Sequence, residues 1–311
     1  MIFKMRLKIL LICAFLPIVA VSQAQQPVNN KKNRVNLEIA PQKTWQEHWW
    51  EHDLLVSRVF YDQNVAFYYD QHMDTTVTWP FKAMSDTWAY VKKTYGNIGT
   101  DPRLYVVFHK VVNNKLGGGH PSPYFDASHD YHNTLDCGLG NWTSPHGEQI
   151  GMPIHEIWHI VTSATHNTKG SPSDVLWGDS KFMEIFNYDV LMNIGMADEA
   201  QKVYVQMQTQ HDDFPVAGAQ WFKNWFYPIY KDHGKAAVLN KYFAVLAANF
   251  PKDSDNRFTR DLNWGEFVHF WSGAAGVNLK AQATLAFGWP ADWETQFRAA
   301  QKEFPKVKYA Y

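Results

Sequence analysis

Residues 154–161 constrain the fold of this chain more than any other segment, because they join an apolar run to three ionisable side chains. Those three are His155, Glu156 and His159, and every other position holds isoleucine, tryptophan or valine. A helix of this composition has almost no polar surface and packs in a protein interior. Two histidines and a glutamate buried there need bonding partners. The segment therefore predicts a buried helix that carries a polar site.

The spacing of the two histidines suits the binding of one metal ion. Residues four apart lie above one another on a helix, so His155 and His159 can direct two ring nitrogens at the same ion. Zinc favours such ligands, and catalytic zinc sites combine three protein ligands with an open position for water. Glu156 lies beside that position, where its carboxylate can take a proton from the zinc-bound water and pass it to a leaving group. We expect one zinc ion, with Glu156 as the catalytic base.

A third ligand has to come from another part of the chain. Residues 180–194 predict a helix that is apolar on nearly all sides, with Glu184 and Asp189 on different faces. One of these acids has to be satisfied in the interior, and periodicity does not decide which. Asp179 precedes the predicted helix and can serve either as its cap or as a metal ligand.

These segments together resemble the zincin superfamily of metallopeptidases, in its gluzincin branch. The resemblance rests on His155-Glu-Ile-Trp-His159 and Phe182-Met-Glu-Ile-Phe186 and covers roughly residues 137–195. It implies that Glu184 is the third zinc ligand, with Asp179 as the alternative, and that the substrate is a peptide. It also implies that residues 131–137 form an edge strand to which the substrate backbone adds.

A zinc hydrolase of this kind also needs a group that stabilises the oxyanion, usually a histidine or tyrosine opposite the metal. His269 is our candidate, and Tyr188 and Tyr227 are alternatives. For His269 a second interpretation stays open, in which it is a core histidine bonded to backbone.

The order of the predicted elements indicates an α+β fold of zincin-like type. A mixed sheet and the helix of the histidines occupy residues 39–165, and residues 166–311 form a mainly helical subdomain of the same catalytic region. Strands are predicted at 57–61, 65–69, 104–108 and 131–137. Helices are predicted at 80–96, 154–162, 180–194, 198–210, 220–232, 235–249, 264–272 and 291–303.

A long segment rich in Gly, Pro, Asn, Asp and His precedes the helix of the histidines, at residues 117–151. Loops of this length usually carry function or are disordered. The spacings of its four histidines fit no metal-site template, so we interpret them as solvated loop residues: His120, His129, His132 and His146.

The N-terminus predicts a cleaved signal peptide at residues 1–24. Three basic residues precede an apolar stretch, and Ser22 and Ala24 supply the small residues of a cleavage site. Residues 25–38 are polar and predict a flexible segment. We therefore expect a secreted or periplasmic protein without a transmembrane segment. Only Cys137 remains after cleavage, which excludes an internal disulfide, and no basic cluster points to nucleic acid.

The predicted function is hydrolysis of peptide or glycopeptide amide bonds outside the cytoplasm. The alternative is a non-catalytic protein on the same scaffold that binds carbohydrate or glycopeptide through exposed tryptophans: Trp49, Trp50 and Trp142. A third possibility is an enzyme that residues 25–41 keep inactive by lying in the cleft. Substrate sequence and oligomeric state do not follow from the sequence.

Overall fold

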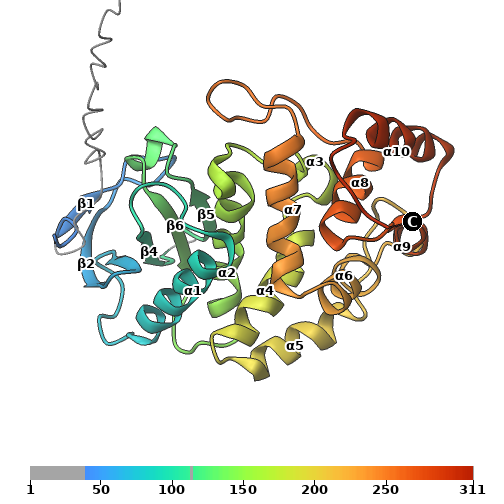
Figure 1. Ribbon diagram of the computed structural model, residues 1–311. Helices are drawn as coiled ribbons and strands as arrows, with labels where there is room; N and C mark the ends of the chain where they lie inside the picture. Colours follow the sequence, from blue (N-terminus) through green and yellow to red (C-terminus); the bar gives the residue numbers. More distant parts are fainter. Residues whose placement is uncertain (1–38, 113–114, 311) are drawn as a thin grey trace, which may run out of the picture. The chain divides into compact units, whose positions relative to one another are not determined.

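In the part of the chain that the structure describes, the N-terminal half contributes all the strands of a mixed sheet (Figure 1). This structure is a computed structural model, and it describes residues 39–112 and 115–310. The strands lie in the order β1-β2-β3-β4-β6-β5. Strands β3, β4 and β6 run parallel, and the other neighbours pair antiparallel. The bounds are β1 Thr44–Gln46, β2 Leu55–Tyr61, β3 Val65–Tyr69, β4 Leu104–Lys110, β5 Gly118–Ser122 and β6 Asn133–Leu139.

The two faces of the sheet pack against different layers because side chains alternate along each strand. On β4, Leu104, Val106 and Phe108 belong to the main apolar core, together with residues of helices α1 (Trp79–Tyr95) and α2 (Glu148–Ala164). Tyr105 and Val107 point to the opposite face, where they meet Trp45 and Trp49. The sheet therefore separates helix α2 from the N-terminal segment 44–52.

The rest of the described chain is mainly helical, as Figure 1 shows in yellow to red. Helix α4 contacts both α2 and α5, and α7, α8 and α10 pack on one another in series. The bounds are α3 Asp174–Trp177, α4 Lys181–Asn193, α5 Ala197–Met207, a π-helical turn Trp221–Phe226, α6 Tyr227–Asp232, α7 Ala236–Asn249, α8 Trp264–Ala275, α9 Lys280–Phe287 and α10 Ala291–Glu303; short 3₁₀ turns span Ala127–His129 and Thr165–Asn167.

The α+β class is confirmed, and each predicted strand and helix has a counterpart. The role of residues 131–137 as an edge strand is wrong. Strand β6 lies inside the sheet between β4 and β5, and the edge is β5, which the sequence did not predict. Its residues are Gly-Gly-His-Pro-Ser, a composition that strands disfavour, although an edge tolerates a proline because one side of the strand needs no ladder bond.

The described residues cluster as a single unit, and the main core contains residues from both predicted subdomains. The predicted signal peptide (1–24) and flexible segment (25–38) lie outside the described residues. Among the described helices, none has both the length and the apolar character that crossing a bilayer requires.

Candidate metal centre and its cavity

Helix α2 carries the candidate site on its second half. It begins at Glu148, six residues before the predicted start, and it includes Pro153. Proline removes one backbone donor from a helix. The histidines follow this point, and Ile154, Ile157, Trp158, Ile160 and Val161 are all buried, as the composition predicted.

His155 and His159 bring their Nε2 atoms to within 3.2 Å of each other. Two donors of a tetrahedral zinc ion at ordinary bond lengths lie roughly 3.3 Å apart, so this spacing suits a shared ion. Burial lowers the pKa of both rings, and for His159 the adjacent His155 helps to bring the pKa to about 4. The rings are therefore neutral at physiological pH, which is the form that binds metal.

Asp179 supplies the nearest carboxylate to this pair. Its Oδ1 lies 3.1 Å from Nε2 of His159, and its Oδ2 lies 3.8 Å from Nε2 of His155. The three residues form one group whose potential ligand atoms all lie within 4.8 Å of one another. Asp179 sits in the exposed turn between α3 and α4, where Gly178 adopts a φ of 59°. Asp179 is thus the acid that completes a three-residue donor set.

Glu184, the predicted third ligand, is not part of that donor group. It lies in the first turn of α4 and is 5% exposed. Burial and the charge of Asp212 raise its pKa to about 8, against the opposing effects of Lys181 and a bond from the Phe222 backbone. The geometry favours the alternative, Asp179, because its carboxylate lies next to both histidines, in the turn before α4, whereas Glu184 lies within α4.

The proposed base, Glu156, is held between the helix and the edge strand. It is 6% exposed, and burial with the charges of Asp179 and Asp136 raises its pKa to about 8. The backbone of Gly119 on β5 passes so close that a Cβ atom there would lie 2.6 Å from Oε1 of Glu156. A glycine at this position is therefore needed for the carboxylate to keep its place.

A cavity of about 570 Å³ opens beside these groups. His155, Glu156 and Asp179 line it, together with Glu184 and Asn187 from α4. One oxygen of each of the last two, Oε2 of Glu184 and Oδ1 of Asn187, is buried without a hydrogen-bond partner. Buried acceptors of this kind are costly when unpaired. The cavity wall therefore offers two acceptors for the donors of a ligand.

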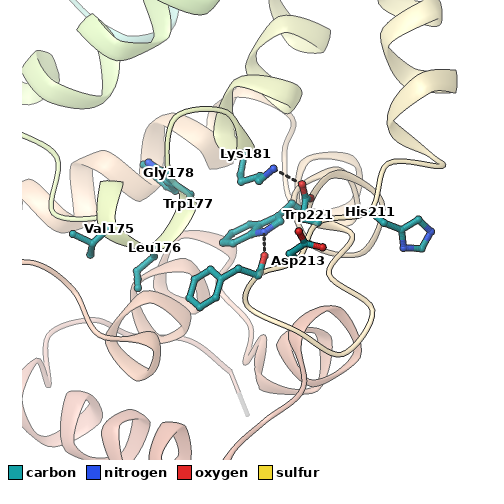
Figure 2. A pocket seen from close by; sticks show the side chains of 10 residues that line it. Val175, Leu176, Trp177, Gly178, Lys181, His211, Asp213 and Trp221 are labelled. Carbon is teal, nitrogen blue, oxygen red and sulfur yellow. Dashed lines mark hydrogen bonds and ion pairs between the residues drawn. The ribbon is translucent and has the colours of Figure 1, made fainter.

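A second cavity, of about 390 Å³, is lined in part by residues close to Asp179 in the sequence (Figure 2). Gly178 and Lys181 flank Asp179 and line it, and Lys181 pairs with Asp212. Trp221 donates from Nε1 to the carbonyl of Phe214 at 2.9 Å, as Figure 2 also shows. Neighbouring residues of segment 178–181 thus line two different cavities.

His269 lies elsewhere, in the core around α8. Its Nδ1 contacts the Tyr309 hydroxyl at 2.9 Å and its Nε2 the carbonyl of Phe304 at 3.3 Å. It does not line the cavity beside Glu156, and neither do the alternatives, Tyr188 and Tyr227. The oxyanion role proposed for His269 does not fit this position, because both ring nitrogens already have partners. His269 corresponds to the core histidine that the sequence left open.

The loop histidines divide into two classes. His146 is exposed and pairs with Glu199 at 2.7 Å, in keeping with a solvated residue. His120 and His129 are buried, at 6% and 2% exposure, and their Nε2 atoms lie 3.2 Å apart. His132 is partly buried and stacks on Tyr105. The prediction of solvated residues is therefore wrong for the buried pair, because β5 and the turn at 127–129 fold this loop onto the sheet.

Two of the three tryptophans proposed as a binding platform are also inside. Trp49 and Trp142 are 1% and 2% exposed, and their indole nitrogens bond to Asp136 and to the His109 carbonyl. Only Trp50 is exposed, at 73%. A row of three exposed aromatic rings does not exist at these positions.

Sequence reasoning missed a second group of donors, on the sheet face away from α2. Glu47, His52, His109 and Asp136 are all buried, and this group could hold a metal ion. The four positions are spread over 90 residues in no recognised spacing. Only the alternation of β4 and β6, which points His109 and Asp136 away from the main core, gives a signal in the sequence.

Comparison with known proteins adds little to this geometry. No protein family model matches the chain, and no curated protein matches it. One solved structure, titled as a functionally unknown conserved protein from Bacillus anthracis str. Ames, is similar at 12% identity with a TM-score of 0.48. The match covers 80% of this chain and 51% of that one, so this chain spans about half the length of that structure.

Proposed function

We propose that the protein is a zinc-dependent hydrolase that cleaves peptide or related amide bonds. The observation that carries the proposal is the convergence of His155, His159 and Asp179 next to Glu156 at the wall of a cavity. Two neutral imidazoles and a carboxylate are a donor set that suits a catalytic zinc ion, which needs one position left open. When bound, the ion would polarise the substrate carbonyl and make water more acidic.

Glu156 performs the proton transfers in this proposal. As the oxygen of water bonds to the carbonyl carbon of the substrate, the carboxylate of Glu156 takes the proton that the water loses. When the carbon–nitrogen bond breaks, Glu156 gives this proton to the departing amine. A base with a pKa close to the working pH suits both steps, and burial gives Glu156 such a value.

The edge strand and the cavity wall position the substrate. Strand β5 pairs on one side with β6, and Gly119 lines the cavity. An extended peptide can therefore add to its other side by main-chain hydrogen bonds. The unpaired oxygens of Glu184 and Asn187 would accept N–H donors of the same ligand.

The decisive test replaces Glu156 with Gln in the zinc-loaded protein. We expect hydrolysis of a fluorescence-quenched peptide library to fall by roughly 10²–10⁴-fold, because the side-chain amide of glutamine cannot accept the proton of water. Zinc content should stay unchanged. The matched control is Glu303→Gln, an exposed glutamate of α10. Hydrolysis that survives Glu156→Gln at the wild-type rate would refute the mechanism.

A second test distinguishes the two candidate third ligands. Asp179→Ala and His159→Ala should each weaken zinc binding at this site, because each removes a donor of the three-residue group. Glu184→Ala should leave zinc bound, since Glu184 is outside that group. Zinc measured per chain after dialysis decides the point. Loss of zinc from Glu184→Ala but not from Asp179→Ala would restore the original assignment.

A further inference from the structure

The buried group on the far face of the sheet joins four side chains from distant parts of the chain. Glu47 and His52 come from the N-terminal segment, His109 from β4 and Asp136 from β6. Their exposed fractions are 2%, 6%, 0% and 1%. One potential ligand atom from each lies within 4.8 Å of the other three.

The inner atoms of this group lie close to one another. Nε2 of His109 lies 2.8 Å from Oε1 of Glu47 and 3.1 Å from Oδ1 of Asp136, and Nδ1 of His52 lies 3.0 Å from Oδ2 of Asp136. Even so, Oε1 of Glu47, Nδ1 of His52, Nε2 of His109 and Oδ1 of Asp136 are all buried atoms that have no hydrogen-bond partner. Nitrogen and oxygen atoms of the kinds that bind zinc therefore converge inside the protein, close enough to share one ion.

The outer atoms of three of these side chains are held by neighbouring groups. Oε2 of Glu47 accepts from the backbone N–H of Leu54 at 3.1 Å, and Oδ2 of Asp136 accepts from Nε1 of Trp49 at 2.9 Å. Nδ1 of His109 contacts Oδ2 of Asp70 at 2.9 Å. A carboxylate on the far nitrogen of a histidine fixes the ring and directs its other nitrogen at the metal. The supporting contacts of a metal site are therefore present.

We propose that Glu47, His52, His109 and Asp136 bind a second divalent transition-metal ion, which is structural rather than catalytic. Two imidazoles and two carboxylates supply four nitrogen and oxygen donors, which suit zinc. All four positions are filled by protein and closed to solvent, as in structural sites, whereas a catalytic site keeps one position open. This proposal does not depend on the proposed hydrolase function.

The ion would fasten the N-terminal segment to the sheet that supports the cavity. Residues 44–55 form β1 and the turn that returns to β2, and two of the four ligands lie in this stretch. The other two lie on β4 and β6. Asp136 is the register partner of His120 on β5, next to the Gly119 that approaches Glu156. The second ion thus stabilises the strands against which the base is positioned.

The test uses the full chain with His155 and His159 both changed to Ala, so that only the buried group can hold metal. After loading with Zn²⁺ and dialysis, we expect one zinc per chain in this variant and two in the wild type. A chelator should lower the Tm of the variant by about 5–10 °C, and added Zn²⁺ should restore it. This comparison changes none of the four buried ligands.

Further substitutions assign the ion to the group. In the same background, His52→Gln should remove the remaining zinc and the response to chelator. The control is His269→Gln, another buried histidine, whose ring nitrogens have other partners, and it should keep one zinc. A double variant that holds no zinc and melts at the same temperature with and without chelator overturns the proposal. Loss of hydrolysis in the double variant concerns the first site alone, so the two proposals can fail separately.

Discussion

At the scale of single residues, the geometry of the candidate site depends on close contacts between residues far apart in the sequence as well as on the histidine motif. Gly119 illustrates this, since its backbone lies where any side chain would meet the carboxylate of Glu156. Sequence spacing identified Glu156 but not its contact with this glycine, because the two are 37 positions apart and meet only through the pairing of β5 with β6. The position of the Glu156 carboxylate is therefore constrained by the edge strand β5.

Replacing Gly119 with Ala should lower activity while metal binding remains. The added Cβ would lie 2.6 Å from Oε1 of Glu156, so the carboxylate has to move by several tenths of an ångström or more. Misplacement of a catalytic group by about 1 Å costs on the order of 10²-fold in rate. We expect kcat to fall by roughly 10–100-fold with an unchanged zinc content.

The control for this change is Gly140→Ala, since a Cβ at Gly140 would meet no atom within 4 Å. Activity should persist in that variant. A Gly119→Ala protein with wild-type kcat would show that the glycine does not constrain Glu156.

At the scale of elements, helix α4 connects the site to the helical layer through Asp189. This residue is fully buried, and its carboxylate accepts from Tyr90 of α1 at 2.7 Å and from Tyr230 of α6 at 2.8 Å. Asn193 of α4 donates to it as well, at 3.2 Å. Asp189 is thus the acid of α4 that is satisfied in the interior, whereas Glu184 faces the cavity. Periodicity placed the two on different faces but did not show which face meets hydroxyl donors.

Asp189 should make stability depend on pH between about 4 and 6. Burial raises its pKa to about 6 despite the two tyrosine bonds. Over this range the unfolded chain loses its proton while the folded chain keeps it, so the unfolding free energy decreases as pH rises. For a pKa raised this far, the decrease is on the order of 3 kcal/mol. At a pH below both pKa values, the carboxyl group is protonated in the folded and the unfolded chain, so it no longer lowers the unfolding free energy.

Urea unfolding at several pH values measures this effect as a difference between variants. Asp189→Asn cannot titrate, so its unfolding free energy relative to the wild type should increase from pH 4 to pH 7. Asp232→Asn, at an exposed position on α6, should show no such trend. Parallel pH profiles for the wild type and Asp189→Asn would contradict the assignment.

The elements that the sequence predicted well are those with clear periodicity, and those it missed are held by tertiary contacts. Helix α10 matches its predicted bounds, and Gly96 caps the end of α1 as expected. Strand β5 was missed because Gly-Gly-His-Pro-Ser has no strand pattern and is ordered only by pairing with β6. For the same reason His120 was assigned to solvent. His155, Glu156 and His159 followed from local spacing, whereas the choice of Asp179 over Glu184 and the buried four-residue group required the fold.

At the scale of the whole molecule, the sheet and the helical layer share one apolar core. This core runs from Val65 and Val106 in the strands through Trp158 on α2 to Trp225 and Trp271 in the helical half. Neither half buries its apolar surface alone, because α2 and α4 pack against each other across the predicted boundary at residue 165. The candidate metal centre also needs both halves, since its histidines lie before that boundary and Asp179 lies after it.

The zinc-saturated protein should therefore unfold in one cooperative transition. Far-ultraviolet circular dichroism reports mainly on the helices, and fluorescence also reports on Trp45 and Trp49 on the outer sheet face. We expect the two signals to change at the same urea concentration, as two-state unfolding requires. A chain of residues 39–165 alone should lack a cooperative transition, whereas a chain of residues 39–311, as the control for truncation, should keep it. Two separate transitions, or a fragment 39–165 that melts cooperatively, would show that the halves are independent domains and that the site forms only where they dock.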